Sequence, residues 1–215
     1  MKNNFIAHRG NNVLKCENRL EIIKDVLKFD YISGIEVDIR KTLDNKFVLS
    51  HNRFLKNDKL ININKYKLKN LLKMEFYINN KLFKIHTLEE LLKINTDKII
   101  IIEIKDNINI TKLHKILKKH SSLNLYICSF NYDFIYQFKK KYSNYKCGLI
   151  IGYLMNVAKD IDIFDFLMFH YSSILKTTKP YFVWTVNNNK VFDKLENDIL
   201  GTITDITYIL KKNKL

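Results

Sequence analysis

The sequence predicts a compact (β/α)8 barrel of the TIM type, with a β-hairpin after the second strand and some reduced crossover helices. Short apolar runs alternate with segments of helical spacing along the chain, and eight of these runs are typical of strands. The length of 215 residues lies near the short end of the range for this fold. An open, doubly wound sheet fits the same alternation, so periodicity alone leaves both architectures open.

The predicted strands share a dominance of aliphatic and aromatic residues. They are Phe5–Ala7, Ile35–Ile39, Ile99–Ile104, Leu123–Phe130, Cys147–Gly152, Phe166–His170, Tyr181–Val186 and Gly201–Thr204. Helical spacing lies between most of them, at Glu21–Phe29, Leu88–Ile94, Ile110–Lys119, Tyr132–Lys141 and Lys190–Leu195. Thr87 followed by Glu90 predicts a capping box at the start of the second helix. Residues 175–179 are too few for a full helix, so that crossover is predicted to be reduced. No linker or low-complexity break interrupts the order, and residues 1–215 are predicted to form a single domain.

The chain is strongly basic, with 37 Lys and Arg against 22 Asp and Glu and a net charge of +15. A hydrophobic content of 47% is enough to bury a core, which excludes disorder driven by charge. Almost all of the positive charge is lysine, which is typical of compositional bias and weakens the charge as evidence for a polyanionic partner. We expect no specific nucleic-acid partner. A non-enzymatic basic protein that binds nucleic acid or an anionic membrane remains an alternative.

The sequence gives no sign of export or of membrane insertion. The first residues turn polar at once, and the longest aliphatic run, Ile99–Ile102, is far below the roughly 18 residues that a transmembrane helix needs. Cys16, Cys128 and Cys147 have no metal-binding spacing, which favours reduced thiols. We therefore expect a cytoplasmic protein without a transmembrane segment. The oligomeric state is not indicated.

Charged residues gather where the first three predicted strands end: His8, Arg9, Glu36, Asp38, Glu103 and Lys105. In parallel α/β folds the carboxyl ends of the strands form the working face. Three carboxylates without a cysteine are the oxygen-rich set that Mg²⁺ or Ca²⁺ prefers, so one divalent cation is predicted. Arg9 and Lys105 supply positive charge for phosphate oxygens. The combination predicts a small phosphate ester as substrate.

A hairpin is predicted to bring a second histidine to the same place. If Asp44-Asn45 is its two-residue turn, Asp38 lies opposite His51, with side chains about 5 Å apart. Glu36 shares the face of Asp38 through the two-residue period of a strand. An unperturbed histidine has a pKa of about 6.5, so one of His8 and His51 can accept a proton while the other donates one.

Five further residues are candidates for lining the pocket because they lie at or near strand ends: Asn18, Ser129, His170, Trp184 and Asn187. For Trp184, core packing is an equally good interpretation, because an aromatic residue at a strand end serves either purpose. Asp205, at the end of the last predicted strand, is interpreted as a loop cap.

Nine short motifs occur in order along nearly the whole chain. They are His8-Arg9-Gly10, Glu17-Asn18, Glu36-Val37-Asp38, Thr42-Leu43-Asp44, His51, Glu103-Ile104-Lys105, Ser129-Phe130, Trp184-Thr185-Val186-Asn187 and Thr202-Ile203-Thr204-Asp205. This ordered set resembles the glycerophosphodiester phosphodiesterase family. The resemblance implies a TIM-type barrel that hydrolyses glycerophosphodiesters to glycerol phosphate and an alcohol. It also implies that His8 and His51 are the acid–base pair, that Arg9 and Lys105 hold the phosphate, and that Glu36, Asp38 and Glu103 bind the metal.

The chain departs from the family pattern at several positions. Asn52 follows the second histidine where the family usually has Asp, Asn45 stands in the hairpin turn where Gly is usual, and Ile206-Thr207 lacks the frequent proline. The segment between His51 and Leu88 is short for the family's insertion, which predicts a more open alcohol side of the pocket. A lysophospholipase D or sphingomyelinase D-like activity is an alternative on the same scaffold, but it requires an apolar groove.

Overall fold

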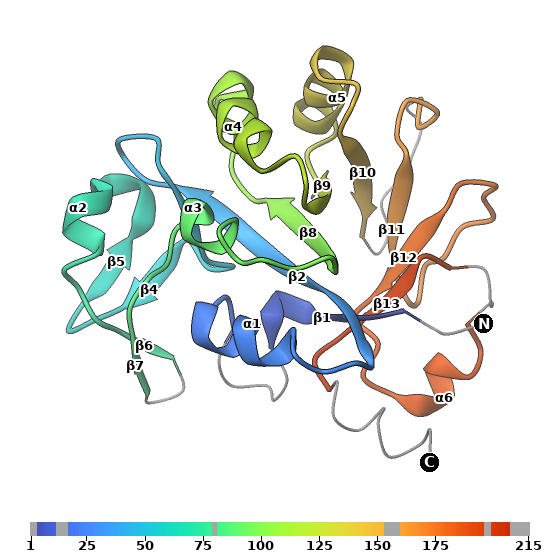
Figure 1. Cartoon of the computed structure of the whole chain (residues 1–215), viewed down its shortest axis with the longest axis horizontal. Coiled ribbons are helices and arrows are strands. Elements are labelled where there is room, and N and C mark those ends of the chain that lie inside the picture. Colours follow the sequence, from blue (N-terminus) through green and yellow to red (C-terminus); the bar gives the residue numbers. More distant parts are fainter. Residues whose placement is uncertain (1–3, 12–16, 79–80, 153–159, 196–198, 207–215) are drawn as a thin grey trace.

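The computed structural model describes residues 4–11, 17–78, 81–152, 160–195 and 199–206, and it confirms the predicted barrel (Figure 1). Eight parallel strands form its wall: β1 (Phe5–Ala7), β2 (Ile32–Lys41), β8 (Ile99–Ile104), β9 (Asn124–Ser129), β10 (Lys146–Ile151), β11 (Phe166–His170), β12 (Tyr181–Trp184) and β13 (Gly201–Thr204). Strand β1 pairs with both β13 and β2, which closes the ring. The open-sheet alternative is therefore wrong.

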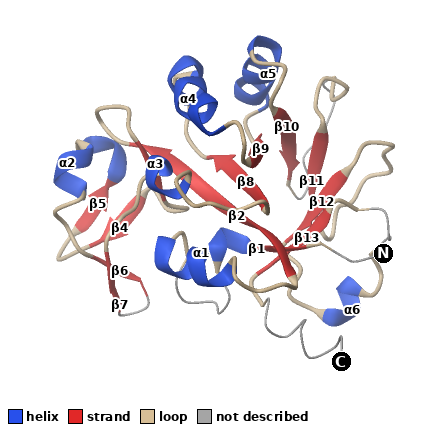
Figure 2. Cartoon of the chain, viewed as in Figure 1, coloured by secondary structure: helices blue, strands red, loops and turns tan. Residues whose placement is uncertain are grey.

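The helices are shorter than those of a full-size barrel. They are α1 (Leu20–Val26), α3 (Leu88–Leu91), α4 (Ile110–Leu117), α5 (Tyr132–Lys141) and α6 (Asn189–Phe192), with the 3-10 turns η1 (His8–Gly10) and η3 (Lys118–His120). Figure 2 shows α4 and α5 side by side outside the strands. Residues 171–180 contain no helix, which confirms the reduced crossover between β11 and β12. None of the helices in the described ranges has the length and apolar composition that a bilayer span requires.

The capping box of α3 is present as predicted. The Thr87 hydroxyl accepts from the Glu90 backbone N–H at 3.1 Å, and the Glu90 carboxylate accepts from the Thr87 backbone N–H at 2.7 Å. Each contact satisfies a backbone donor that the first helical turn leaves free. The local sequence therefore sets where α3 begins.

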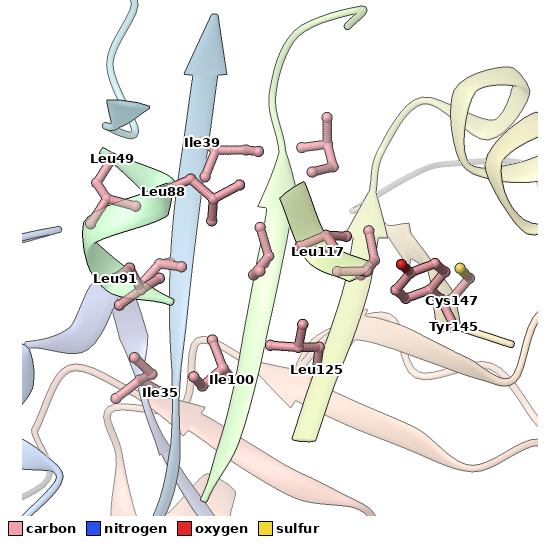
Figure 3. Packing of buried hydrophobic residues seen from close by; sticks show 14 of the residues in the cluster. Ile35, Ile39, Leu49, Leu88, Leu91, Ile100, Leu117, Leu125, Tyr145 and Cys147 are labelled. Atoms are coloured by element: carbon pink, nitrogen blue, oxygen red, sulfur yellow. The ribbon is translucent and has the colours of Figure 1, made fainter. Parts of the chain in front are cut away.

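The alternation of side chains along β2 decides what faces the barrel lumen. Ile35, Val37 and Ile39 belong to the large apolar cluster between strands and helices, and Figure 3 shows Leu88 and Leu91 of α3 against this side of β2. Because successive side chains of a strand point to opposite faces, Glu36 and Asp38 face the lumen. The lumen is filled by a separate set: Ile6, Ile101, Cys128, Ile150, Phe166, Met168, Phe182 and Ile203. Packing outside the barrel thus fixes the direction of the carboxylates inside it.

The hairpin is present, but its predicted register is wrong by one residue. Strand β3 (Phe47–Leu49) pairs antiparallel with β2 so that Ile39 faces Leu49. The Ser50 backbone N–H donates to the Asp38 carbonyl at 3.0 Å, so Ser50 and not His51 lies opposite Asp38.

The reason for the shift is a loop of three residues instead of two. The Thr42 backbone N–H donates to the Lys46 carbonyl at 2.9 Å, and Asn45 adopts a left-handed φ of 54°. The Thr42 hydroxyl also donates to the Asp44 carboxylate at 2.7 Å. A left-handed residue at the end of a three-residue loop is a common hairpin geometry, and asparagine tolerates it.

A small antiparallel sheet lies between His51 and α3, where the sequence analysis assigned no strands. Its strands are β4 (Phe54–Lys56), β5 (Leu60–Asn62), β6 (Phe76–Ile78) and β7 (Lys81–Phe83), in the order β5-β4-β6-β7, with the turn η2 (Ile63–Lys65) and α2 (Leu68–Leu71) between β5 and β6. It has its own apolar cluster, which includes Leu55, Ile61, Phe76 and Phe83. Three-residue strands are too short for alternation to be recognised in the sequence.

Candidate active site

The first strand delivers His8 and Arg9 through a tight turn. Arg9 has a left-handed φ of 53°, and its backbone N–H donates to the Glu36 carboxylate at 2.9 Å. Gly10 follows with a φ of 63°, and a Cβ atom there would lie 2.2 Å from Cγ1 of Ile23. Glycine is the residue that tolerates both the conformation and the close approach. The His-Arg-Gly motif thus has a structural reason for its third member.

Glu36, Asp38 and Glu103 form one buried acidic cluster at the mouth of the barrel. Asp38 of β2 lies beside Glu103 of β8 in the strand register, and Glu36 lies two residues before Asp38 on the same face. One carboxylate oxygen from each residue lies within 4.8 Å of the others. The three side chains are also almost inaccessible to solvent. Adjacent parallel strands therefore bring together three residues that are far apart in the sequence.

Burial and the neighbouring charges shift the pKa values of the three carboxyl groups in different directions. Burial, together with the charge of Asp38, raises the pKa of Glu36 well above its ordinary value and that of Glu103 to about 7. Burial acts on Asp38 in the same direction, but the charges of Lys105 and Arg9 outweigh it and hold the pKa of Asp38 below its ordinary value. Asp38 is therefore the carboxylate that the neighbouring cations keep ionised.

The two cations reach the cluster from different strands. Lys105 Nζ lies 2.7 Å from Glu103 Oε1 and 3.2 Å from Asp38 Oδ1. Arg9 forms an ion pair with Glu17, and its Nε lies 3.6 Å from Asp38 Oδ2. That Nε is buried and has no hydrogen-bond partner among the described residues. Both side chains therefore bring positive charge to the edge of the acidic cluster.

His8 is held by a carboxylate that the sequence interpretation did not assign to the site. His8 Nδ1 lies 2.6 Å from Asp205 Oδ1, and the Asn187 amide donates to Asp205 Oδ2 at 2.7 Å. Burial alone would raise the pKa of Asp205, but the hydrogen bond with His8 holds it below its ordinary value. A carboxylate partner assigns the proton to Nδ1, which leaves His8 Nε2, 3.9 Å from Glu36 Oε2, as the free nitrogen.

Barrel closure places Asp205 in the site, whereas the sequence predicts a loop cap. Asp205 follows β13, the last strand, while His8 follows β1, the first, and these two strands pair side by side. Asp205 lies at the carboxyl end of a strand, and this position could have identified it. Only the closure of the barrel shows that its neighbour there is His8.

His51 enters from the end of the hairpin and has a different environment. Its Nδ1 lies 3.2 Å from the Asn52 side-chain oxygen, so its partner is an amide and not a carboxylate. Burial lowers the pKa of His51, and the charges of Arg9 and Lys105 act in the same direction, with Asp38 opposing them. The two histidines of the site thus differ in their supporting groups.

A cavity of about 260 Å³ connects these groups. It is lined by His8, Arg9, Glu36, His51, Glu103, Lys105, Phe130, Ile150, Met168, Trp184, Thr185 and Ile203. Asp38 lies immediately behind this lining, through its contacts with Lys105 and Arg9. One side of the cavity is therefore charged and the other is apolar.

Of the five candidate pocket residues, Trp184 lies in the lining of this cavity and the other four lie outside it. Asn18 exchanges two hydrogen bonds with Asp38, at 2.9 and 3.0 Å, and Asn187 holds Asp205. The Ser129 hydroxyl donates to the Ile104 carbonyl at 2.8 Å, and His170 pairs with the Ser172 hydroxyl at 2.7 Å. Asn18 and Asn187 thus support residues of the site from outside the cavity.

A closed parallel barrel whose mouth combines two histidines, three carboxylates and two cations defines the class of barrel enzymes that act on phosphate esters. The sequence matches the model of the Glycerophosphoryl diester phosphodiesterase family over residues 8–207. The chain therefore belongs to this family, and it is an enzyme of phosphodiester hydrolysis.

Solved structures agree with this assignment. A glycerophosphodiester phosphodiesterase from Thermotoga maritima is 27% identical, with a TM-score of 0.79 and 97% of each chain covered. A phosphodiesterase from Oleispira antarctica, solved in complex with the product sn-glycerol-3-phosphate, is 20% identical, with a TM-score of 0.83 over 99% of this chain and 97% of that one. A comparison with curated proteins finds no significant match.

Proposed function

We propose that this enzyme cleaves glycerophosphodiesters to glycerol phosphate and an alcohol, with His8 and His51 as the acid–base pair and with a divalent cation held by Glu36, Asp38 and Glu103. The observation that carries the proposal is the cavity, where two differently supported histidines face an acidic cluster and two cations. The glycerol phosphate bound to the Oleispira antarctica phosphodiesterase supports the same substrate class.

We assign the role of general base to His8. Asp205 accepts from Nδ1, so Nε2 is free to take a proton from the group that attacks the phosphorus, which is water or a hydroxyl group of the substrate. The carboxylate also stabilises the imidazolium that this step forms, as the aspartate of a catalytic triad does. Asn187 keeps the Asp205 carboxylate oriented toward His8.

We assign the role of general acid to His51. His51 lines the cavity, and its Nδ1 lies 3.2 Å from the Asn52 side-chain oxygen, so its ring has an amide and not a carboxylate to hold the charge of an imidazolium. In this role His51 donates a proton to the oxygen of the departing alcohol. A histidine pair with unequal support is suited to one proton acceptor and one proton donor.

Arg9 and Lys105 are proposed to hold the phosphate. Arg9 lines the cavity, and its guanidinium is a planar fork of donors that matches phosphate oxygens. Lys105 Nζ lies within the lining of the cavity beside Glu103, where it can approach a second oxygen. Both charges would neutralise the phosphate as negative charge develops.

The acidic cluster fits a divalent cation. Carboxylate oxygens lie about 2.0–2.6 Å from Mg²⁺ or Ca²⁺, which places any two ligand atoms within about 5 Å of each other. The spread of 4.8 Å between the three oxygens meets this condition. When bound, the cation would supply positive charge that stabilises the phosphate oxygens. Glu36, Asp38 and Glu103 would be its protein ligands, and Asn18 would keep Asp38 in place.

We further propose that the enzyme acts in the cytoplasm on a small-molecule substrate. Cys128 and Cys147 are both buried free thiols, and Cys16 lies outside the described residues. Free thiols are typical of a reducing compartment.

A substrate screen tests the proposed function directly. We expect the purified chain to release glycerol phosphate from glycerophosphocholine when Mg²⁺ or Ca²⁺ is added, and to lose this activity in chelator. Enzymatic assay of glycerol phosphate gives the rate for each metal and each alcohol group. If no phosphodiester is cleaved with any metal, and the chain instead binds DNA in a salt-sensitive way, the basic binding protein is the better interpretation.

A second substrate belongs in the same screen because of the apolar rim. Trp184 in the cavity contacts the His170 ring at a centroid distance of 5.2 Å, and His170 contacts exposed Tyr171 at 4.5 Å. Ile174 and Leu175, in the same loop, are exposed as well. Such a surface favours binding of an acyl chain. An enzyme with a lysophospholipase D-like activity should cleave lysophosphatidylcholine faster than glycerophosphocholine.

The raised pKa of Glu103 predicts how a metal changes stability with pH. Its pKa of about 7, against an ordinary value of 4.5, means that the folded chain binds more protons than the unfolded chain between these two values. The contribution of Glu103 to stability therefore falls as the pH rises through this window. A cation that pairs with the ionised cluster reverses this loss. We expect Mg²⁺ or Ca²⁺ to raise Tm little near pH ~5 and clearly near pH ~7.5. At the higher pH, a cation at 100 times its Kd adds about 2.7 kcal/mol to the free energy of unfolding.

Thermal unfolding at both pH values, with metal and with chelator, measures this difference. Glu103→Gln removes the titrating group and one ligand, so it is expected to reduce the metal-induced shift at the higher pH. An equal shift at both pH values would contradict a cation at this cluster.

A further inference from the structure

A buried ion pair lies behind His51, outside the cavity. Asp106 follows β8, and its side chain is 3% exposed. Its Oδ1 accepts from Arg40 Nη1 at 2.7 Å and from Arg53 Nη2 at 3.1 Å, and its Oδ2 accepts from the Lys41 backbone N–H at 3.0 Å. Asp106 thus ties the end of β8 to the hairpin strand β2 and to the segment after His51.

Arg40 makes one more contact, and this one reaches the site. Its Nε donates to the backbone carbonyl of His51 at 2.9 Å, while its Nη1 remains on Asp106. The Arg40 side chain is 13% exposed, so this fork is shielded from water. One guanidinium therefore bridges a buried carboxylate and the peptide group of His51.

The backbone around His51 depends on this bridge. Strand β3 ends at Leu49, and the last backbone hydrogen bond toward β2 is that of Ser50. In the described part of the chain, His51 itself makes no backbone–backbone hydrogen bond. Its ring nitrogen Nδ1 lies 3.2 Å from the side-chain oxygen of the adjacent Asn52. Arg40 is thus the contact that connects the His51 peptide to the barrel wall.

We propose that Arg40 is a positioning residue for His51 and that Asp106 is the anchor that holds Arg40 in this role. The proposal rests on the proposed acid–base role of His51. Displacement of a reacting group by about 1 Å can cost about 10²-fold in rate. Release of the His51 peptide should therefore lower kcat while substrate binding by Arg9 and Lys105 continues.

Arg40→Lys separates positioning from stability. Lysine keeps a positive charge beside Asp106 but lacks the fork that reaches two acceptors. We expect kcat for glycerophosphocholine to fall about 10- to 100-fold, with KM changed by less than about threefold. Asp106→Asn, which weakens the anchor, should act in the same direction. Arg53→Ala is the matched control, because Arg53 contacts the same oxygen of Asp106 but not His51, and it should retain the wild-type kcat.

Two readouts distinguish positioning from a general loss of structure. The first readout uses the para-nitrophenyl diester of glycerol phosphate, whose leaving group needs no protonation. With this diester, the loss of kcat in Arg40→Lys should be much smaller than with glycerophosphocholine. Histidine ring resonances in ¹H–¹⁵N NMR should change for His51 in Arg40→Lys and not in Arg53→Ala. The NMR result does not require activity, so it remains informative if the proposed reaction is wrong. A wild-type kcat in a folded Arg40→Lys variant, or an equal loss with both esters, would overturn the proposal.

Discussion

His8→Ala is expected to lower kcat by about 10²- to 10⁴-fold, the range for loss of an acid–base group. His8 is the proposed base: its Nδ1 lies 2.6 Å from Asp205 Oδ1, and its Nε2 lies 3.9 Å from Glu36 Oε2. Water can replace His8 only poorly, because it is a much weaker base than an imidazole whose protonated form is stabilised by a carboxylate. Steady-state rates with glycerophosphocholine at saturating metal give the loss in kcat.

The control for His8→Ala is a histidine away from the mouth. His120 lies in η3, between α4 and β9, and so toward the opposite end of the barrel. His120→Ala should retain wild-type activity. Asp205→Asn, which keeps the size of the side chain but removes its charge, should reduce kcat in the same direction as His8→Ala. Near-wild-type activity of folded His8→Ala would refute its role as the base.

His51→Ala is expected to produce a loss of the same order, but one that depends on the leaving group. A poor leaving group such as choline needs a proton as the P–O bond breaks, whereas para-nitrophenolate does not. We expect a loss of about 10²- to 10⁴-fold for glycerophosphocholine and a much smaller loss for the para-nitrophenyl ester. The ratio of kcat for the two esters measures the role of the acid.

The comparison with His8→Ala makes this test specific. Loss of the base should slow both esters, since attack on phosphorus is required for each. If His51→Ala slows both esters equally and His8→Ala does not, the two roles are exchanged. Circular dichroism and Tm of each variant show that the comparison is between folded proteins.

The sequence predicted the barrel and the gathering of charged residues at its mouth because the signals for both are local. Short apolar runs, such as Ile99–Ile102 in β8 and Phe166–Phe169 in β11, indicate strands without knowledge of their partners. The period of two along β2 separated Ile35 and Val37 from Glu36 and Asp38, so the inward-facing carboxylates could be read directly. The family match over residues 8–207 confirms the resemblance that the ordered motifs showed.

The register of the hairpin could not be predicted from the local sequence. Whether the loop has two residues or three depends on the conformation of Asn45, which the Asp44-Asn45 dipeptide does not fix. His51 still enters the cavity, although Ser50 takes the place opposite Asp38, because His51 lies beyond the last residue of β3. The position of His51 is therefore determined by the turn after the strand, where Arg40 holds its carbonyl.

By itself, the sequence determined which residue types occur at the strand ends and on which face of each strand they lie. Only the tertiary structure decided which of them meet. His8 and Asp205 are separated by almost the whole chain, and the closure of β1 against β13 brings them together. Arg40, Asp106 and His51 belong to three different segments. Contacts of this kind depend on strand order and register in the closed barrel, which no local pattern of residues encodes.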